Sequence, residues 1–204
     1  EKYVSKKLSI AIVAVDPTSP FSGGAILGDR IRFSKNYDND NVYFRSMATR
    51  GSQGGLTFSS EMIADVFDAA KFDIIIYETV GVGQMELDVM EIVDSVIVTL
   101  VPESGDDIQM MKSGIMEIAD IYVINKSDRD GADKLKVILN NLLVSKPGKE
   151  WFPEIINTVA TKGNGVGDLI VSIDRHKKFN IENNVDRLKF DRRYIRRVHK
   201  SISE

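Results

Sequence analysis

The sequence predicts an α/β protein built on a doubly wound, mainly parallel sheet. Three observations lead to this prediction. Short apolar runs rich in β-branched residues recur along the chain, helix-period segments separate several of them, and the strongest runs are continuous rather than alternating. Continuous apolar runs are typical of strands buried on both faces of a parallel sheet. Their alternation with helices is typical of doubly wound folds.

Each element follows from its own pattern. The apolar runs predict strands over 8–15, 42–47, 72–79, 95–101, 121–125 and 154–160. The helical spacing of apolar residues predicts helices over 59–71, 85–94, 107–120 and 132–145. The basic stretch 185–204 predicts a terminal helix, which is either a solvated face or an oligomerisation arm.

Composition limits the classes of function. The 204 residues suffice for one α/β domain and a small appendage, with 43% hydrophobic and 28% charged residues. A net charge of −3 does not favour nucleic-acid binding, and no apolar run has membrane-spanning length. The absence of cysteine excludes disulfides and Cys-ligated metals, which weakly favours a cytosolic or organellar protein.

The tetrapeptide NKSD, Asn125 to Asp128, ends the apolar run before it and is read as a guanine-binding loop. An Asp carboxylate can accept parallel hydrogen bonds from the N1–H and N2 amino group of guanine, a pair that adenine does not offer. In this interpretation Asn125 braces the loop and meets the base. The stem of Lys126 lies along the purine, and Asp128 discriminates guanine from adenine. A motif of only four residues often occurs by chance, so its position directly after a predicted strand is the stronger evidence.

Carboxylates follow two further strands, where ligands bind in open α/β sheets. Asp16 follows the first run, Asp29 closes the loop after it, and Glu78 ends the run FDIIIY. These acids could converge on Mg²⁺, which prefers oxygen ligands and retains several waters. The alternative is that Asp16 and Asp29 cap turns or helices.

The segment ETVGVGQ suits a phosphate switch. Gly81 lies three residues after Glu78, where a backbone N–H can approach a γ-phosphate without a side chain intervening. Gln84 is polar and nearby, but two residues later than the water-orienting Gln of many small GTPases. An ordinary glycine-rich turn is the alternative.

A second base-contacting loop is predicted at ATKGNG, with Ala160, Thr161 and Lys162, although a simple turn would also explain it. No phosphate-binding G-x-x-x-x-G-K-[ST] motif occurs, and GNGVGDL lacks its Lys and Ser/Thr. The two histidines, His176 and His199, lie in polar sequence and suggest surface positions.

Four segments together resemble one family. AVDPTSPFSGGAILGDRIRF, RSMATRGSQGGL, ETVGVGQ and GDDIQMMKSGIMEIADIYVINKSDRDGA are similar to the MeaB/ArgK family, G-protein chaperones of cobalamin-dependent acyl-CoA mutases, over roughly residues 8–170. The resemblance implies a P-loop NTPase fold of the signal-recognition and MinD-like class. It also implies Mg²⁺-dependent GTP hydrolysis that gates cofactor loading and protects a mutase of the methylmalonyl-CoA type.

The resemblance also assigns individual residues. It places Asp16 and Asp29 in the first switch and, with Glu78, among the Mg²⁺ acids; Gly81 to Gln84 match the second switch. It implies a third switch over 104–112 that contacts the mutase, with polar residues Asp106, Gln109 and Lys112. Lys112 could meet the developing phosphoryl charge.

The resemblance implies a GTPase domain over 1–178 and a helical extension over 179–204, similar to a dimerisation arm. The family's first strand and phosphate-binding loop would precede Glu1, so an N-terminal truncation and weak nucleotide binding by this chain are expected. GTP or GDP, a mutase client and a homodimer are the expected partners, without nucleic acid or membrane. The expected location is the cytoplasm, or the mitochondrial matrix in a eukaryote. The alternatives are a non-hydrolysing partner-binding module and another metallochaperone-type GTPase.

Overall fold

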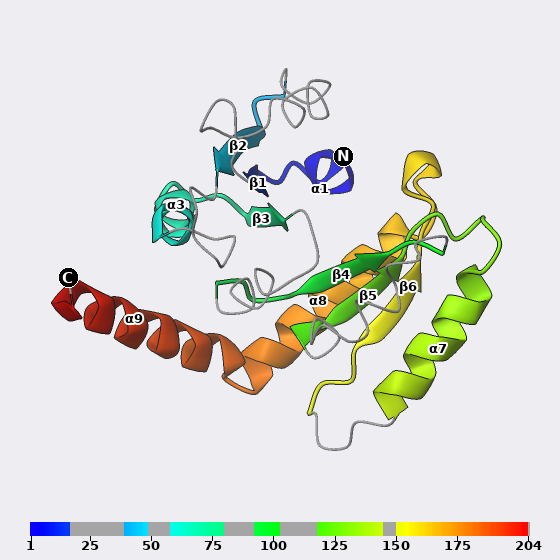
Figure 1. The fold of residues 1–204 in the computed structure, drawn as a ribbon. Coiled ribbons are helices and arrows are strands. Elements are labelled where there is room, and N and C mark those ends of the chain that lie inside the picture. The colour runs from blue at the N-terminus through cyan, green and yellow to red at the C-terminus, as the bar shows by residue number, and fades with distance from the viewer. Residues whose placement is uncertain (17–38, 49–57, 80–91, 103–117, 145–149, 204) are drawn as a thin grey trace. The chain divides into compact units, whose positions relative to one another are not determined.

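The computed structural model describes residues 1–16, 39–48, 58–79, 92–102, 118–144 and 150–203. The chain divides into two compact units, Glu1–Val89 and Met90–Glu204, each with its own three-stranded parallel sheet (Figure 1). The elements are α1 (Lys2–Ser5), β1 (Ile10–Asp16), β2 (Val42–Ala48), α3 (Phe58–Ala69), β3 (Ile74–Thr79), β4 (Ile97–Leu100), β5 (Ile121–Ile124), α7 (Ala132–Val144), β6 (Glu154–Asn157), the 3₁₀ helix η2 (Ala160–Lys162), α8 (Val166–Glu182) and α9 (Val185–Ser203).

The first unit is organised around β1, the central strand of the order β2-β1-β3. Ile10 of β1 is paired with Val42 of β2 and with Ile74 of β3, and both pairings are parallel. Five residues of β1 are buried, as expected for a strand with neighbours on both sides: Ile10, Ala11, Val13, Ala14 and Val15.

A polar contact fixes the start of this sheet. The backbone N–H and the hydroxyl of Ser9 both donate to Oδ2 of Asp73, each at 2.8 Å. These two hydrogen bonds lower the pKa of the Asp73 carboxyl, since they favour its charged form. They connect the residue before β1 to the residue before β3, which is 64 positions later in the sequence.

The second unit has the strand order β4-β5-β6, and all four residues of β5 are buried. Tyr122 and Ile124 belong to one core cluster with Leu135, Leu139 and Leu143 of α7. Because side chains alternate along a strand, Ile121 and Val123 face the other side of the sheet. The helix α8 packs against β5 and β6, so that helices cover the sheet (Figure 1).

The predicted α/β fold with parallel strands is confirmed, and each of the six predicted strands is present. The described strands form two three-stranded sheets, one in each unit. The predicted terminal helix is α9. The helices predicted over 85–94 and 107–120 lie mainly outside the described residues. The domain boundary predicted after residue 178 falls within α8 and stays a prediction.

The surface position expected for His176 is wrong. Ser172, His176 and Asn180 form a polar row along α8 at four-residue intervals, and they are 0%, 2% and 1% exposed. Residues spaced in this way share one face of a helix, and here that face is turned inward. The side chain of His199 lies outside the part of the chain that the structure describes.

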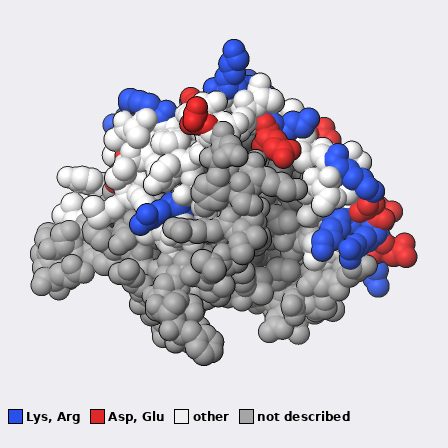
Figure 2. All heavy atoms as spheres, turned by 90° about the horizontal axis from the view of Figure 1, so that it is seen from above, with Lys and Arg blue, Asp and Glu red and all other residues white. Residues whose placement is uncertain are grey.

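Two further observations concern the surface. No helix in the described ranges combines the length and hydropathy needed to cross a membrane. On the face shown in Figure 2, basic and acidic side chains lie near one another over the described surface.

Candidate functional site

Two loops of the second unit meet at the carboxyl ends of β5 and β6. The backbone N–H of Asn125 donates to the carbonyl of Leu100 at 2.8 Å, which continues the pairing of β5 with β4. The N–H of Thr158 donates to Ile124 at 2.9 Å, and that of Ser127 donates to Thr158 at 3.0 Å. The NKSD loop and the loop after β6 are therefore held side by side by backbone hydrogen bonds.

The side chain of Asn125 strengthens this connection. Its Oδ1 accepts the N–H of Ala160 at 3.1 Å and the hydroxyl of Thr158 at 3.2 Å. A backbone N–H is only a donor, so the atom that faces Ala160 must be the amide oxygen. The amide nitrogen of Asn125 then carries two N–H donors, which suit an acceptor atom on a base.

Lys126 adopts an unusual backbone conformation. Its φ of 55° lies in the left-handed region, which residues other than glycine seldom occupy, and its side chain is exposed. Such a conformation costs on the order of 1–2 kcal/mol and persists where the surrounding structure fixes it. In this case the hydrogen bonds of Asn125 and Ser127, on either side of Lys126, fix the loop.

Asp128 and Lys162 form an ion pair between the two loops. Nζ of Lys162 lies 2.8 Å from Oδ2 of Asp128, with the side chains 62% and 42% exposed respectively. The hydrogen bond from Lys162 lowers the pKa of Asp128, and the charges of Lys162 and Arg129 add to this effect. The carboxylate thus stays ionised and accepts hydrogen bonds.

The loop after β6 takes its shape from two glycines. Gly163 and Gly165 both have a φ of 72°. Asn164, which lies between the two glycines, forms a β-bridge with Val159, which follows β6. A Cβ on Gly165 would lie 2.0 Å from the carbonyl oxygen of Asn157, whereas one on Gly163 would meet nothing within 4 Å. The close approach at Gly165 lets α8 begin immediately beside the candidate site.

The structure therefore brings together most of the residues predicted to read the base. Asn125, Asp128, Ala160 and Lys162 are joined by direct contacts, and the backbone of Lys126 bends between them. Thr161 lies in η2 with an exposed side chain. Sequence reasoning missed Thr158 and Gly165. The signal for Gly165 was its place between a strand and a helix, where a tight turn needs a positive φ.

The predicted metal ligands belong to the first unit. Asp16 is the last residue of β1 and Glu78 the penultimate residue of β3; in the register of these neighbouring strands, Ala14 is opposite Glu78. Both residues therefore lie at the carboxyl ends of adjacent parallel strands. Within the described ranges, no three His, Asp or Glu side chains are grouped to hold a metal ion. Asp29 lies outside these ranges, so the predicted set stays a prediction.

The remaining predicted residues also lie outside the described part of the chain. They are Gly81 and Gln84 of the second switch and Asp106, Gln109 and Lys112 of the third.

The fold indicates the general class of protein. Parallel sheets covered by helices, with polar loops at the carboxyl ends of the strands, are the α/β arrangement of nucleotide-binding proteins. A LAO/AO transport system kinase has the same fold, with a TM-score of 0.75, 23% identity and coverage of 99% of this chain and 60% of the other. HypB from Helicobacter pylori, solved with nickel, has a TM-score of 0.55 at 17% identity, covering 86% of this chain and 77% of HypB.

The chain belongs to the family of methylmalonyl-CoA mutase-associated GTPases, MeaB, whose family model matches residues 1–204. The predicted family and P-loop GTPase fold class are therefore confirmed.

Three relatives illustrate the family. A Pyrococcus horikoshii protein named as an inferred GTPase is 48% identical over 176 residues, which are 84% of this chain and 56% of the relative. The GTPase ArgK of Escherichia coli is 33% identical over 171 residues, 81% of this chain and 52% of ArgK. The mitochondrial methylmalonic aciduria type A homolog of Mus musculus is 36% identical over 165 residues, 78% of this chain and 40% of the homolog. The chain thus spans about half the length of these relatives.

Proposed function

We propose that the chain binds guanine nucleotides through the NKSD loop and η2, as the base-reading part of a GTPase of its family. One observation carries the proposal: the contacts of Asn125 with Ala160 and of Asp128 with Lys162 hold the two loops together. The left-handed Lys126 supports it, because strained residues gather at functional sites.

Asp128 supplies the discrimination in this proposal. Its ionised carboxylate accepts from N1–H and the N2 amino group of guanine, whereas adenine presents no such pair of donors. An acceptor left without a donor on binding the wrong base costs orders of magnitude in affinity. The stem of Lys126 lies along the purine, and the amide nitrogen of Asn125 donates to the base.

Hydrolysis and magnesium form the second part of the proposal. Carboxylate oxygens are suitable Mg²⁺ ligands. Asp16 and Glu78, near the ends of β1 and β3, are two of the three acids expected to bind the ion, and Asp29 is the third. Bound Mg²⁺ would neutralise phosphate charge. The phosphate-contacting and charge-stabilising roles fall to Glu78, Gly81, Gln84 and Lys112.

The partner is proposed from the family. The family description names methylmalonyl-CoA mutase, and we propose that this protein is a chaperone that gates cofactor loading and protection of a cobalamin-dependent acyl-CoA mutase of that type. Asp106 and Gln109 would contact the client. A homodimer through the C-terminal helix, and a cytoplasmic or mitochondrial-matrix location, belong to the same proposal. Co-sedimentation with such a mutase in GDP and in a GTP analogue tests the association, and equal absence of binding in both contradicts it.

The base-reading role is tested by titrating the isotopically labelled chain with GDP and with ADP. Weak affinity is expected, because the sequence lacks the phosphate-binding loop that supplies most phosphate contacts. Amide resonances of Asn125, Ser127 and Ala160 should shift with GDP at concentrations at least about tenfold below those needed for ADP. Equal responses to the two nucleotides would contradict the proposal.

A pair of variants sharpens this test. Asp128→Asn should lose the preference for GDP and gain one for xanthosine diphosphate, since the new amide donates to the 2-oxo group and accepts from N1–H. Asp130→Asn is the matched control, because Asp130 is exposed on the same turn two residues later. The control should behave like the parent chain.

A further inference from the structure

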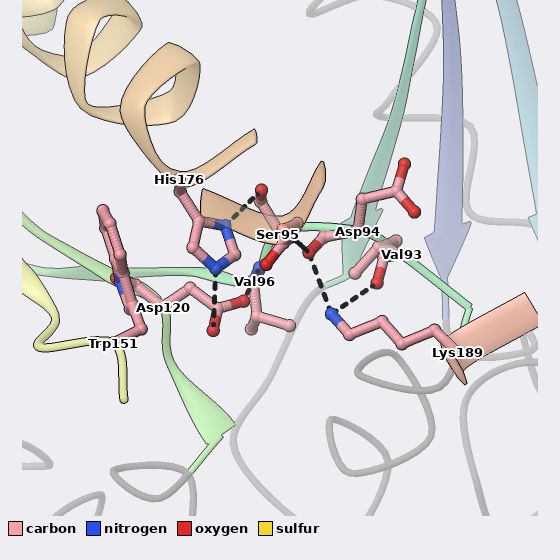
Figure 3. A network of polar contacts seen from close by, with 9 residues as sticks. Val93, Asp94, Ser95, Val96, Asp120, Trp151, His176 and Lys189 are labelled. Carbon is pink, nitrogen blue, oxygen red and sulfur yellow. Dashed lines mark hydrogen bonds and ion pairs between the residues drawn. The ribbon is translucent and has the colours of Figure 1, made fainter. Parts of the chain in front are cut away.

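Side chains of α8 and α9 hold the segment that leads into β4. Ser95 Oγ lies 2.7 Å from Nδ1 of His176 (Figure 3). Nδ2 of Asn180 donates to the carbonyl of Asp94 at 3.0 Å. From α9, Nζ of Lys189 donates to the same Asp94 carbonyl at 2.8 Å and to that of Val93 at 3.3 Å. Both helices are thus attached to one short segment.

His176 is at the centre of this network, as Figure 3 shows, and only 2% of it is exposed. Its Nε2 lies 3.5 Å from Oδ1 of Asp120, whose Oδ2 accepts the N–H of Val96 at 2.8 Å. The ring of Trp151 lies against the imidazole with a centroid distance of 4.8 Å, and Nε1 of Trp151 donates to the carbonyl of Asp120 at 2.8 Å.

These contacts suit a neutral imidazole. In the neutral ring the Ser95 hydroxyl donates to Nδ1, and the N–H on Nε2 faces Asp120. A second proton on Nδ1 would require the hydroxyl to turn and accept instead, and it would place a cation where water is almost excluded.

The surrounding charges oppose one another. Asp120 just before β5, Asp94 before β4 and Asp186 on α9 favour a charged imidazole, whereas Lys189 on α9 disfavours it. Burial is the largest effect, so the pKa of His176 is lowered from 6.5 despite the carboxylates. Burial and the charge of Asp94 raise the pKa of Asp186 in the same cluster.

We propose that His176 is an acid-sensitive latch that holds α8, and through the shared Asp94 carbonyl also α9, to the segment leading into β4. The neutral ring closes the latch, and protonation opens it. The pH window follows from the sign of the linkage. Because the folded state disfavours the charged ring, its contribution to stability is complete above the ordinary pKa of 6.5 and declines as the pH falls below that value. The proposal does not depend on nucleotide binding.

The sequence provides a direct test, because the chain has two histidines and one tryptophan. An NMR titration of the parent chain from pH 7.5 to 5 should show His176 titrating below 6.5, with a simultaneous shift of the Trp151 indole N–H. Over the same range the amides of residues 93–96 and 185–190 should lose protection, measured as their exchange rate relative to the intrinsic rate at each pH. His199→Gln assigns the two histidine signals.

Two variants separate the latch from other titrations. His176→Gln should abolish the coupled Trp151 shift, while Asp186→Asn should retain it. A His176 pKa at or above 6.5, a Trp151 signal that does not follow His176, or amide protection in these segments that does not change with pH would overturn the proposal. The titration of the parent chain decides the question even where His176→Gln does not fold.

Discussion

The ion pair between Asp128 and Lys162 joins residues 34 positions apart, and neither could be matched to the other from the sequence. NKSD was recognisable because its four residues are contiguous and follow an apolar strand. The contacts of Thr158 and Ala160 with Asn125 could be identified only from the structure, because they join loops that follow two different strands. Local spacing therefore predicted the residues that we propose to meet the base, but not the contacts that join them.

Replacing Lys162 by Met should raise the pKa of Asp128 back toward its ordinary value, because the hydrogen bond from Lys162 is the largest cause of its lowering. Carboxyl-carbon NMR of Asp128 measures the change. Since the pair is exposed, guanine affinity should change by less than about tenfold. Lys134→Met on α7 is the control, and an unaltered Asp128 titration in Lys162→Met would show that the pair does not persist in solution.

His176 shows how a polar residue misleads sequence reasoning. Hydropathy assigns polar positions to the surface, but Ser172, His176 and Asn180 occupy one inward face of α8, where His176 and Asn180 find hydrogen-bond partners. The four-residue spacing of these polar side chains was visible in the sequence. The partner positions, Asp94 and Ser95, were not, because they lie more than 80 residues away.

At the scale of elements, the strands were predictable and the connections were not. Each predicted run became a strand, and the runs of β1 and β5 are continuous because these strands are largely buried on both faces. The loop between β6 and α8 depends instead on backbone conformation. Two glycines with the same φ of 72° play different roles in it, since only Gly165 approaches the backbone of Asn157.

This difference makes a quantitative prediction. Gly165→Ala combines a disfavoured φ with a Cβ at 2.0 Å from a backbone oxygen, so it should destabilise the second unit by more than about 3 kcal/mol. Gly163→Ala incurs only the conformational cost, about 1–2 kcal/mol. Urea unfolding followed by Trp151 fluorescence compares them, and equal losses of stability would refute the assigned roles.

The whole molecule consists of two units that each contain their own sheet. The second unit has a core cluster that includes Leu100, Tyr122, Ile124, Leu135 and Leu139, and it also contains the candidate base-reading loops. The predicted metal acids Asp16 and Glu78 belong to the first unit. The residues proposed to read the base and those predicted to bind Mg²⁺ therefore belong to different units of the chain.

The second unit, residues 90–204, should accordingly fold in isolation, because its sheet, core and covering helices are internal to it. Trp151 is its only tryptophan and reports its unfolding. We expect a single cooperative urea transition, and an Asp128 pKa lowered as in the entire chain. A fragment without a cooperative transition would show that the first unit is needed to complete the core.

The left-handed backbone of Lys126 has a consequence for laboratory evolution. Gly and Asn adopt a φ of 55° at lower cost than Lys, so a library screened only for heat resistance should enrich them at position 126. Those substitutions would remove the aliphatic stem that we assign to the purine. Thermal selection and ligand selection would thus draw this position toward different amino acids, and the divergence between the two enriched pools would itself reveal where the protein pays stability for recognition.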